Sequence, residues 1–306
     1  MQNQYHFQEM NILKEIDMLS NSESIEIKQI IGGYVNKTYL ISVIDNGQIN
    51  ANYILRICQL NTQNSETIQF ETTHSIQYTI TNFSGLYGIG PKVLFTNEDN
   101  TKMLMEYIDG SELTSQIFSK IILENIMKSL KKFHQVPEFY QTCRHYNTFD
   151  HIKEMLKYVA HGAVSDRDME AINKIEICVS HGNEKYMKFC HNDLHKGNIL
   201  VRKDSSVSII DYDYCGIFDV MYDIATIYHS LELDCQDESI NQFIVEYFGY
   251  TDDKLLERFK LFSIVYHFWN AVWFLSRVAN NDSFYNFGMK SLVKFRELLH
   301  FVYTTM

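Results

Sequence analysis

The first third of the chain changes from a helical to a strand-like pattern of hydrophobic positions. Residues 6–19 place apolar side chains at helical spacing, which predicts a helix. From about residue 25 to 58 the chain shows short β-rich runs, interrupted by Gly32-Gly33 and by Asn46-Gly47. Asn-Gly tolerates the positive φ angles that a two-residue turn requires, so the second interruption predicts a β-hairpin.

The pattern then predicts one more helix, over residues 65–83, and two more strands, over residues 92–96 and 102–107. Asp109-Gly110 is expected to be a hinge. Beyond it the chain is mostly helical, with strand-like runs at 187–190, 198–202 and 207–210. We therefore expect an α+β protein with two lobes: a small β-rich lobe over residues 1–108 that binds the nucleotide, and a larger, mainly helical lobe over residues 109–306 for catalysis and substrate binding. A cleft between such lobes is the natural place for a nucleotide.

One segment is long and uncharged enough to raise the question of a membrane span. Residues 261–276 carry no formal charge, but they contain Ser263, His267 and Asn270 and are bounded by Lys260 and Arg277. A bilayer span needs about 20 apolar residues. We predict a buried helix and no insertion into a membrane.

Composition and charge narrow the partners. The net charge of −11 argues against nucleic acid, which binds Lys and Arg. It is compatible with a cationic substrate, and equally with a role in solubility alone. The six cysteines form no C-x-x-C pair, so neither a disulfide framework nor a zinc site is indicated. With an N-terminus that lacks the regions of a signal peptide, this favours a reducing cytosol.

The run from His191 to Leu200, followed by residues 209–213, carries the strongest chemical signal. Asp193 is followed by an amide five positions later, Asn198, and by a second acid, Asp211, at the end of an apolar run. Phosphoryl transfer needs this set: a carboxylate that orients the attacking hydroxyl, and an amide and a carboxylate that hold Mg²⁺ on the nucleotide phosphates. We therefore predict a kinase with ATP and Mg²⁺ as cofactors. Asp213, two residues further on, either assists the metal or faces the substrate.

Two histidines near this acid are not predicted to bind zinc. His191 and His195 lack the H-E-x-x-H pattern, because Asn192 stands in the Glu position and Gly197 interrupts a helix. We expect His191 to be a structural residue of the loop. Asp223 is expected to cap a helix or to brace the same loop.

A glycine-containing loop and a cation on a strand are candidates for contacts with the nucleotide. Gly32 and Gly33 lie between two strand-like runs, where glycines allow a close approach of the backbone to phosphates. Arg56 interrupts an apolar strand and needs a partner if it is half-buried, which Glu71 can supply. The alternative is an edge-strand arginine in water. The full set of nucleotide-binding candidates is Gly32, Gly33, Asn36, Arg56, Glu71 and Glu106.

Aromatic residues gather towards the C-terminal end. Trp269 and Trp273, the two tryptophans of the chain, are four residues apart and so share one helix face, with Tyr266 close by. Core packing is the usual role of such a stripe. Stacked aromatic faces beside carboxylates are also what a quaternary ammonium group needs, at about 0.5–2 kcal/mol per face.

These motifs together resemble those of choline/ethanolamine kinases, within the wider group that includes aminoglycoside phosphotransferases. The resemblance runs from about residue 28 to residue 300. It rests on segments 32–36, 55–56, 89–93, 189–193, 197–200, 210–214, 222–224 and 267–273, with Glu71. Phe189-Cys190-His191-Asn192-Asp193 and Arg56 are closer to choline kinases, since aminoglycoside enzymes usually show His-Gly-Asp and a Lys.

The resemblance implies a two-lobed protein-kinase-like fold and a role for each matching residue. Asp193 would be the catalytic base, and Asn198 and Asp211 the magnesium ligands. Arg56 would contact the ATP phosphates. Asp213 and Trp273 would face the choline ammonium, and we count Trp269 and Tyr266 with them as substrate candidates. Three departures are visible: Asp213 stands where the family has Glu, the tryptophans are four rather than three apart, and His195 is of the aminoglycoside type.

The expected function is transfer of the γ-phosphate of ATP to the hydroxyl of choline or ethanolamine, a small cationic alcohol. The first alternative is an aminoglycoside or other antibiotic phosphotransferase, which uses the same catalytic residues with a wide acidic acceptor site. The second is a binding module without turnover, against which the intact set of Asp193, Asn198 and Asp211 argues. A homodimer is left open.

Overall fold

The computed structural model of the chain describes residues 19, 23–30, 36–58, 73–141, 147–180, 184–233 and 237–305. The chain forms two compact units. Among the described residues, the change from the first unit to the second falls between Asp109 and Gly110. The nucleotide-binding and catalytic roles assigned above to the two parts of the chain stay predictions.

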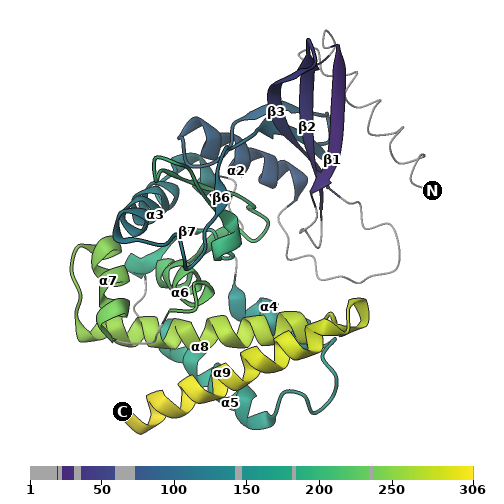
Figure 1. Cartoon of the computed structure of the whole chain (residues 1–306). Helices are drawn as coiled ribbons and strands as arrows, with labels where there is room; N and C mark the ends of the chain where they lie inside the picture. Colours follow the sequence, from purple (N-terminus) through teal and green to yellow (C-terminus); the bar gives the residue numbers. More distant parts are fainter. Residues whose placement is uncertain are drawn as a thin grey trace. The chain divides into compact units, whose positions relative to one another are not determined.

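The first unit contains an antiparallel sheet of five strands, in the order β1-β2-β3-β5-β4 (Figure 1). The strands are β1 (Ser24–Ile30), β2 (Lys37–Asp45), β3 (Gln48–Ile57), β4 (Val93–Thr96) and β5 (Lys102–Glu106). Alternate residues of β2 point to one face because successive side chains of a strand point to opposite sides. Tyr39, Ile41 and Val43 are accordingly buried together in the core of this unit, with Leu55 and Leu104.

The hairpin between β2 and β3 forms where the sequence predicts it. Asn46 and Gly47 both have positive φ angles, of 53° and 70°, and the flanking residues Asp45 and Gln48 pair across the turn. Positive φ at both central positions matches the right-handed twist of the two strands. The predicted two-residue turn is confirmed.

Helix α2 (His74–Leu86) packs beside β4 in the same unit. It begins after Thr73, whose side-chain oxygen accepts a hydrogen bond from the amide of Ile76. Near its end, a Cβ atom on Gly85 would lie 2.6 Å from the carbonyl oxygen of Pro91. Only glycine therefore allows the helix to approach the segment that leads into β4.

The second unit is mainly helical and contains two small sheets. The strands β7 (Met187–Cys190) and β10 (Gly216–Asp219) pair with each other, and β6 (Ser111–Glu112), β8 (Ile199–Val201) and β9 (Val207–Ile209) form a three-stranded sheet. The longer helices are α3 (Lys120–Phe133), α4 (Thr148–Leu156), α5 (Asp166–Ser180), α6 (Val220–Ser230), α7 (Asp237–Phe248), α8 (Asp253–Leu275) and α9 (Ser283–Thr305).

Helices α8 and α9 run side by side, and α8 also packs against α4, α5, α6 and α7 (Figure 1). Within α8, Phe259, Phe262 and Phe268 are fully buried, so the uncharged stretch at 261–276 is a core helix, as predicted. Among the described residues, no helix combines the length and the apolar character that crossing a membrane requires.

The remaining strand and helix predictions divide into three groups. The runs at 92–96, 102–107, 187–190, 198–202 and 207–210 correspond to β4, β5, β7, β8 and β9 within one residue at each end. The predicted helix at 65–83 corresponds to α2 from residue 74 onward, while residues 65–72, and all of the predicted helix at 6–19 except Leu19, lie outside the described residues. The sequence analysis missed the short strands β6 and β10.

Candidate active site

A loop over residues 191–198, here called the first loop, follows β7 and carries the predicted catalytic acid. His191 is buried at its start. Its Nε2 lies 3.0 Å from the carbonyl oxygen of Ile210, and its Nδ1 lies 3.3 Å from the amide nitrogen of Asp193. Burial lowers the pKa of His191 to about 4, so the ring is neutral near pH 7, with Nε2–H donating and Nδ1 accepting. His191 is therefore the structural residue expected, and both nitrogens are engaged.

Asp193 and Asn198 meet because the loop turns back on itself. The side-chain Nδ2 of Asn198 donates to the backbone oxygen of Asp193 at 2.8 Å and lies 3.4 Å from its carboxylate Oδ2. The Asp193 side chain is 23% exposed, so a ligand can reach it. Burial, together with the carboxylates of Asp211 and Asp213, raises the pKa of Asp193 well above its usual range, while the Asn198 hydrogen bond lowers it.

The second loop, residues 210–215, carries the other two acids. Asp211 and Asp213 would lie on the same side only if the strand continued through them, but β9 ends at Ile209. Asp211 has a φ of 67°, and Asp213 lies in a turn. Tyr212 between them is buried and donates its hydroxyl to the oxygen of Ile209 at 2.7 Å. The second loop lies against the first, because Asn192 of the first loop hydrogen-bonds to the backbone oxygen of Tyr214, and the charges of Asp211 and Asp213 contribute to the raised pKa of Asp193.

Asn192 ties the two loops to each other. Its φ of 64° is a conformation that Asn adopts more readily than most residues. Its Nδ2 donates to the backbone oxygens of Tyr214, at 3.0 Å, and Gly216, at 3.3 Å. Its Oδ1 is buried without a hydrogen-bond partner among the described residues. One side chain therefore holds the first loop against the second.

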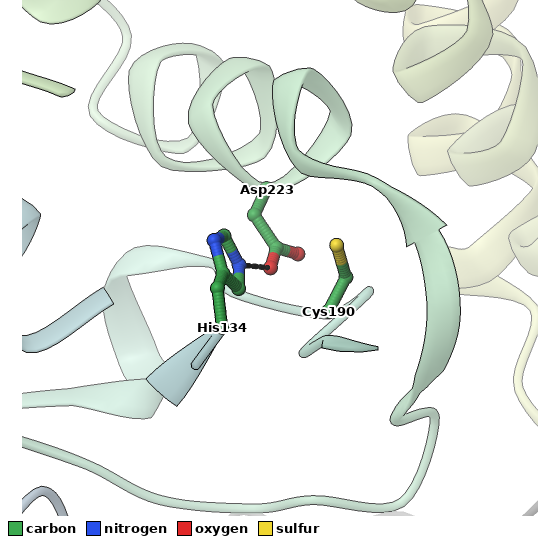
Figure 2. Close-up of side chains that lie close together, drawn as sticks. All are labelled: His134, Cys190 and Asp223. Atoms are coloured by element: carbon green, nitrogen blue, oxygen red, sulfur yellow. Dashed lines mark hydrogen bonds and ion pairs between the residues drawn. The ribbon is translucent and has the colours of Figure 1, made fainter. Parts of the chain in front are cut away.

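Asp223 on α6 holds the first loop in place by hydrogen bonds. Its carboxylate accepts hydrogen bonds from the amides of His191 and Asn192, both at 2.8 Å. Nε2 of His134, at the end of α3, lies 2.9 Å from the same carboxylate, as Figure 2 shows. Nδ1 of His134 lies 2.6 Å from the hydroxyl of Tyr247 on α7. Because Nε2–H donates to Asp223, Nδ1 accepts from Tyr247.

Of the two roles expected for Asp223, the structure shows the brace. The cap of α6 is instead Asp219, which accepts a hydrogen bond from the amide of Met221 at 2.8 Å. Asp219 also pairs with Arg258 of α8. This second buried acid links α6 to the helix that carries the two tryptophans.

The atoms of His134, Cys190 and Asp223 could be mistaken for a metal centre, because their ligand atoms lie within 4.8 Å of one another (Figure 2). Each is already used. The Cys190 thiol donates to the oxygen of Phe218 at 3.3 Å, and burial and nearby acids raise the pKa of Cys190 well above its usual value. A zinc ligand must be a thiolate. The cluster is therefore a hydrogen-bonded support for the loop.

The aromatic residues of α8 lie against the second loop. Nε1 of Trp273 donates to the hydroxyl of Tyr214 at 3.3 Å. Trp269 is 6% exposed, donates to Nδ1 of His151 at 3.3 Å and packs edge-to-face on Tyr214. The two indoles stack with centroids 6.4 Å apart, which confirms that they share one helix face. Trp273 is only partly buried, so it can offer more surface to a ligand than Trp269.

Tyr266 lies one turn before Trp269 on α8. Its ring stacks on His229 of α6, with the centroids 5.7 Å apart. Burial and the charge of Asp193 raise the pKa of Tyr266 well above its usual value, so its hydroxyl stays protonated. Tyr266 therefore packs between α8 and α6, and its contact with the substrate stays a prediction.

The structure describes only part of the predicted nucleotide-binding set. Arg56 lies on β3, which is flanked by β2 and β5, and is 8% exposed, so the reading of an edge-strand arginine in water is wrong. Glu106 ends β5, opposite Tyr53 of β3. Asn36 precedes β2. Gly32, Gly33 and Glu71 lie outside the described residues, and the proposed pairing of Glu71 with Arg56 stays a prediction.

The donor atoms of the second unit fit a magnesium ion. Because Nδ2 of Asn198 donates to Asp193, its Oδ1 is the atom able to bind a cation. Asp211 adds a carboxylate from the neighbouring loop, and its backbone is fixed by the Ile210 amide, which donates to the oxygen of Asn198 at 3.0 Å. Mg²⁺ prefers hard oxygen ligands of this kind.

Sequence analysis missed two residues that organise the site. Tyr214 joins Trp273 to the acidic loop, and its position directly after Asp213 was the available signal. His134 supports Asp223, but 89 residues separate them in sequence and nothing local marks the pairing.

The sequence is similar to those of known proteins. A probable choline kinase of Arabidopsis thaliana is 35% identical over 91 residues, which cover 29% of this chain and 25% of that protein. The chain aligns with between 25% and 33% of the length of the first three curated relatives.

Solved structures share the fold at low sequence identity. A choline kinase from Cryptosporidium parvum superposes with a TM-score of 0.75 at 16% identity, over 97% of each chain. The GDP complex of an aminoglycoside 2′-phosphotransferase variant superposes with a TM-score of 0.65 at 15% identity, over 95% of this chain and 97% of the other. The predicted α+β, protein-kinase-like fold is confirmed.

The model of the choline/ethanolamine kinase family matches residues 27–296, nearly the whole chain. The matched segment contains both loops, the brace on Asp223 and the tryptophans of α8. The chain therefore belongs to the choline/ethanolamine kinase family.

Proposed function

We propose that this protein transfers the γ-phosphate of ATP to the hydroxyl of choline or ethanolamine. The observation that carries the proposal is that the second loop, which contains Asp211 and Asp213, is hydrogen-bonded to α8, which contains the two tryptophans. Asn192, next to Asp193, donates to the backbone oxygen of Tyr214 in the loop that carries Asp211 and Asp213, and the hydroxyl of Tyr214 accepts a hydrogen bond from Trp273. A carboxylate for the hydroxyl and aromatic faces for the ammonium thus occur in one unit of the fold.

Asp193 is the residue that acts on the acceptor. A carboxylate oxygen of Asp193 accepts the hydrogen bond of the alcohol and takes its proton as the oxygen bonds to the γ-phosphorus. The bond from that phosphorus to the bridging oxygen breaks, and ADP leaves. The elevated pKa of Asp193 makes it a better proton acceptor than an ordinary aspartate.

The other residues position Asp193, the metal ion and the two substrates. Asn198 holds the Asp193 end of the loop by its Nδ2 and presents Oδ1, with the carboxylate of Asp211, to a cation. A bound Mg²⁺ would neutralise the negative charge on the phosphates during transfer. Asp213 and Trp273 are proposed to receive the substrate ammonium. Gly32, Gly33, Asn36, Arg56, Glu71 and Glu106 are proposed to bind the nucleotide.

An aminoglycoside acceptor is the second candidate, and one observation favours it. Trp269 is 6% exposed and packs on His151 and Tyr214, so it presents little surface for an aromatic cage. The carboxylate of Asp213 would instead receive an ammonium group of a larger substrate, with Asp211 still assigned to the metal.

A coupled assay of ADP release with Mg·ATP tests the proposal. Choline, ethanolamine and a small panel of aminoglycosides are compared as acceptors, with Asp193→Ala as the control for the site. We expect turnover with choline or ethanolamine that Asp193→Ala abolishes. Turnover with aminoglycosides alone would reject the proposed substrate and keep the catalytic assignment, and full activity of Asp193→Ala would reject that assignment.

A further inference from the structure

An arginine of the protein itself lies on one of the two tryptophans. The guanidinium carbon of Arg277 lies 4.3 Å from the centroid of the Trp273 ring, over its face. This is well within the distance of about 6 Å at which a cation is attracted to an aromatic face. The two residues are four apart, on either side of the end of α8 at Leu275.

The guanidinium is held there by hydrogen bonds from its Nη1. That atom donates to the backbone oxygen of Trp273 at 3.2 Å and to Oγ of Ser276 at 3.1 Å, and it lies 3.7 Å from Sδ of Met155 on α4. Three contacts from two helical segments restrict the position of the charge. The stacking on Trp273 is therefore a fixed feature of the fold.

The indole N–H edge of Trp273 faces the second loop, residues 210–215. Nε1 of Trp273 donates to the hydroxyl of Tyr214, the neighbour of Asp213, and Trp269 stacks on Trp273 as well. A cationic ligand that approaches Trp273 from the second loop therefore contacts a ring on which the Arg277 guanidinium already lies. The electrostatic attraction of an aromatic ring arises from its negative faces, and a positive charge on one face repels a second cation near the ring.

We infer that Arg277 is a specificity-determining residue, which competes with the substrate ammonium for Trp273 and lowers the affinity of the site for quaternary ammonium groups. This inference rests on the proposed function, because it assumes that the ammonium of the acceptor lies beside Trp273. It concerns the charge of the acceptor and not its shape. A neutral molecule of the same shape as choline is unaffected by the charge of Arg277.

Arg277→Gln and Arg277→Lys separate charge from packing. Glutamine is neutral and retains an amide donor for the oxygen of Trp273, whereas lysine keeps the positive charge. The ligands are choline chloride and its neutral isostere 3,3-dimethylbutan-1-ol, at constant ionic strength. Both tryptophans of the chain lie at this site, so intrinsic fluorescence reports binding directly, without nucleotide and without turnover. Thermal unfolding of each variant checks that it is folded.

We expect Arg277→Gln to tighten choline binding by about 3–10-fold and to change binding of the neutral isostere by less than about 2-fold. Arg277→Lys is expected to bind choline as the unaltered protein does. Equal changes for both ligands in Arg277→Gln would overturn the inference, because they would show an effect on shape. Absence of choline binding in all three proteins would also overturn it.

The ADP assay distinguishes this inference from the proposed function. Choline turnover by the unaltered protein, with an unchanged ratio of choline to isostere affinity in Arg277→Gln, rejects the role of Arg277 alone. Absence of choline turnover, with a choline-selective gain in Arg277→Gln, rejects the proposed reaction and supports the competition at Trp273.

Discussion

The Nε2 atom of His134 lies 2.9 Å from Oδ2 of Asp223, and both side chains are almost completely buried. The same carboxylate accepts the amides of His191 and Asn192, which directly precede Asp193. The position of Asp193, the proposed catalytic residue, thus depends on a carboxyl group placed on a helix 30 residues later in the sequence. A chain of contacts runs from Tyr247 through His134 and Asp223 to the loop.

The first prediction tests this brace with Asp223→Asn. An amide oxygen can replace one carboxylate oxygen, but its NH₂ group would face a backbone N–H and leave a buried donor unsatisfied. We expect the free energy of unfolding to fall by about 3 kcal/mol and kcat to fall by about 10–100-fold as the loop shifts. Urea unfolding and the ADP assay measure the two effects.

The control for charge alone is Glu98→Gln, since Glu98 is exposed. It should change neither quantity. If Asp223→Asn unfolds at the urea concentration of the unaltered protein, the hydrogen bonds of Asp223 contribute little and the brace is not what holds the loop.

The second prediction concerns the left-handed backbone of Asn192. Its side chain joins the two loops and its φ is 64°. Asn192→Gly keeps the backbone conformation and loses the hydrogen bonds, whereas Asn192→Ala loses the bonds and strains the backbone. We expect Ala to be less stable than Gly by about 1 kcal/mol. At most positions in a folded chain the order is reversed, because glycine costs more backbone entropy.

Chemical denaturation of the two variants decides this. Equal stabilities, or a more stable alanine variant, would mean that position 192 relaxes out of the left-handed region at little cost.

Local signals explain why much of the site could be predicted from sequence. Asp193 and Asn198, five residues apart, are hydrogen-bonded within one loop. Asn46-Gly47 forms its turn through its own φ angles. Neither depends on distant parts of the chain. The hairpin is thereby confirmed, whereas the roles of Asp193 and Asn198 stay predictions.

The missed features depend on residues that are far apart in sequence. The burial of Arg56, which the sequence analysis expected without excluding an edge strand, follows from β5, which pairs with β3 from nearly 50 residues later. The sequence does not mark the end of β9 either: the Ile210 amide still bonds to the oxygen of Asn198 in register with β8, and the φ of 67° at Asp211 then ends the extended backbone before Asp213. Patterns within one segment do not contain these pairings.

The third prediction is a gain in stability from Asp193→Asn. The pKa of Asp193 is raised in the folded protein. The folded state therefore holds its proton to higher pH than the unfolded chain, and the ionisation of Asp193 lowers the stability as pH rises. At pH 7.5 in EDTA, we expect Asp193→Asn to raise Tm by about 2–4 °C, equivalent to roughly 1 kcal/mol, while abolishing turnover.

Asp204→Asn is the control with the opposite sign. Asp204 is exposed, and hydrogen bonds from Ser206 lower its pKa. The substitution should leave Tm unchanged or slightly reduced. A fall in Tm for Asp193→Asn would show that burial and the neighbouring acids do not disfavour the ionised form of Asp193 in the folded protein without metal.

The fourth prediction is a loss of stability in mild acid caused by two partly buried histidines whose Nε2 atoms are shielded from water. His229 on α6 and His267 on α8 pack edge-to-face, with centroids 4.7 Å apart. Their Nε2 atoms are buried without a hydrogen-bond partner among the described residues. Burial, together with Lys294, lowers the pKa of His229 to about 3 and, with the further charge of His229, that of His267 to about 2.

The sign follows from proton uptake. Below about pH 6.5 both histidines become protonated in the unfolded chain but stay neutral in the folded protein, so the unfolded state is favoured as pH falls. Each histidine should reduce the unfolding free energy by up to about 1.4 kcal/mol per pH unit in this range.

Urea unfolding at pH 7.0, 6.0 and 5.5 gives the slope of the unfolding free energy against pH. In His229→Gln/His267→Gln the slope should be smaller by the contribution of both rings, since glutamine does not titrate. His161→Gln, at an exposed position, should keep the parental slope. Parallel slopes for the double variant and the unaltered protein would mean that this pair takes up protons in the folded state, and that the acid sensitivity of the fold arises elsewhere.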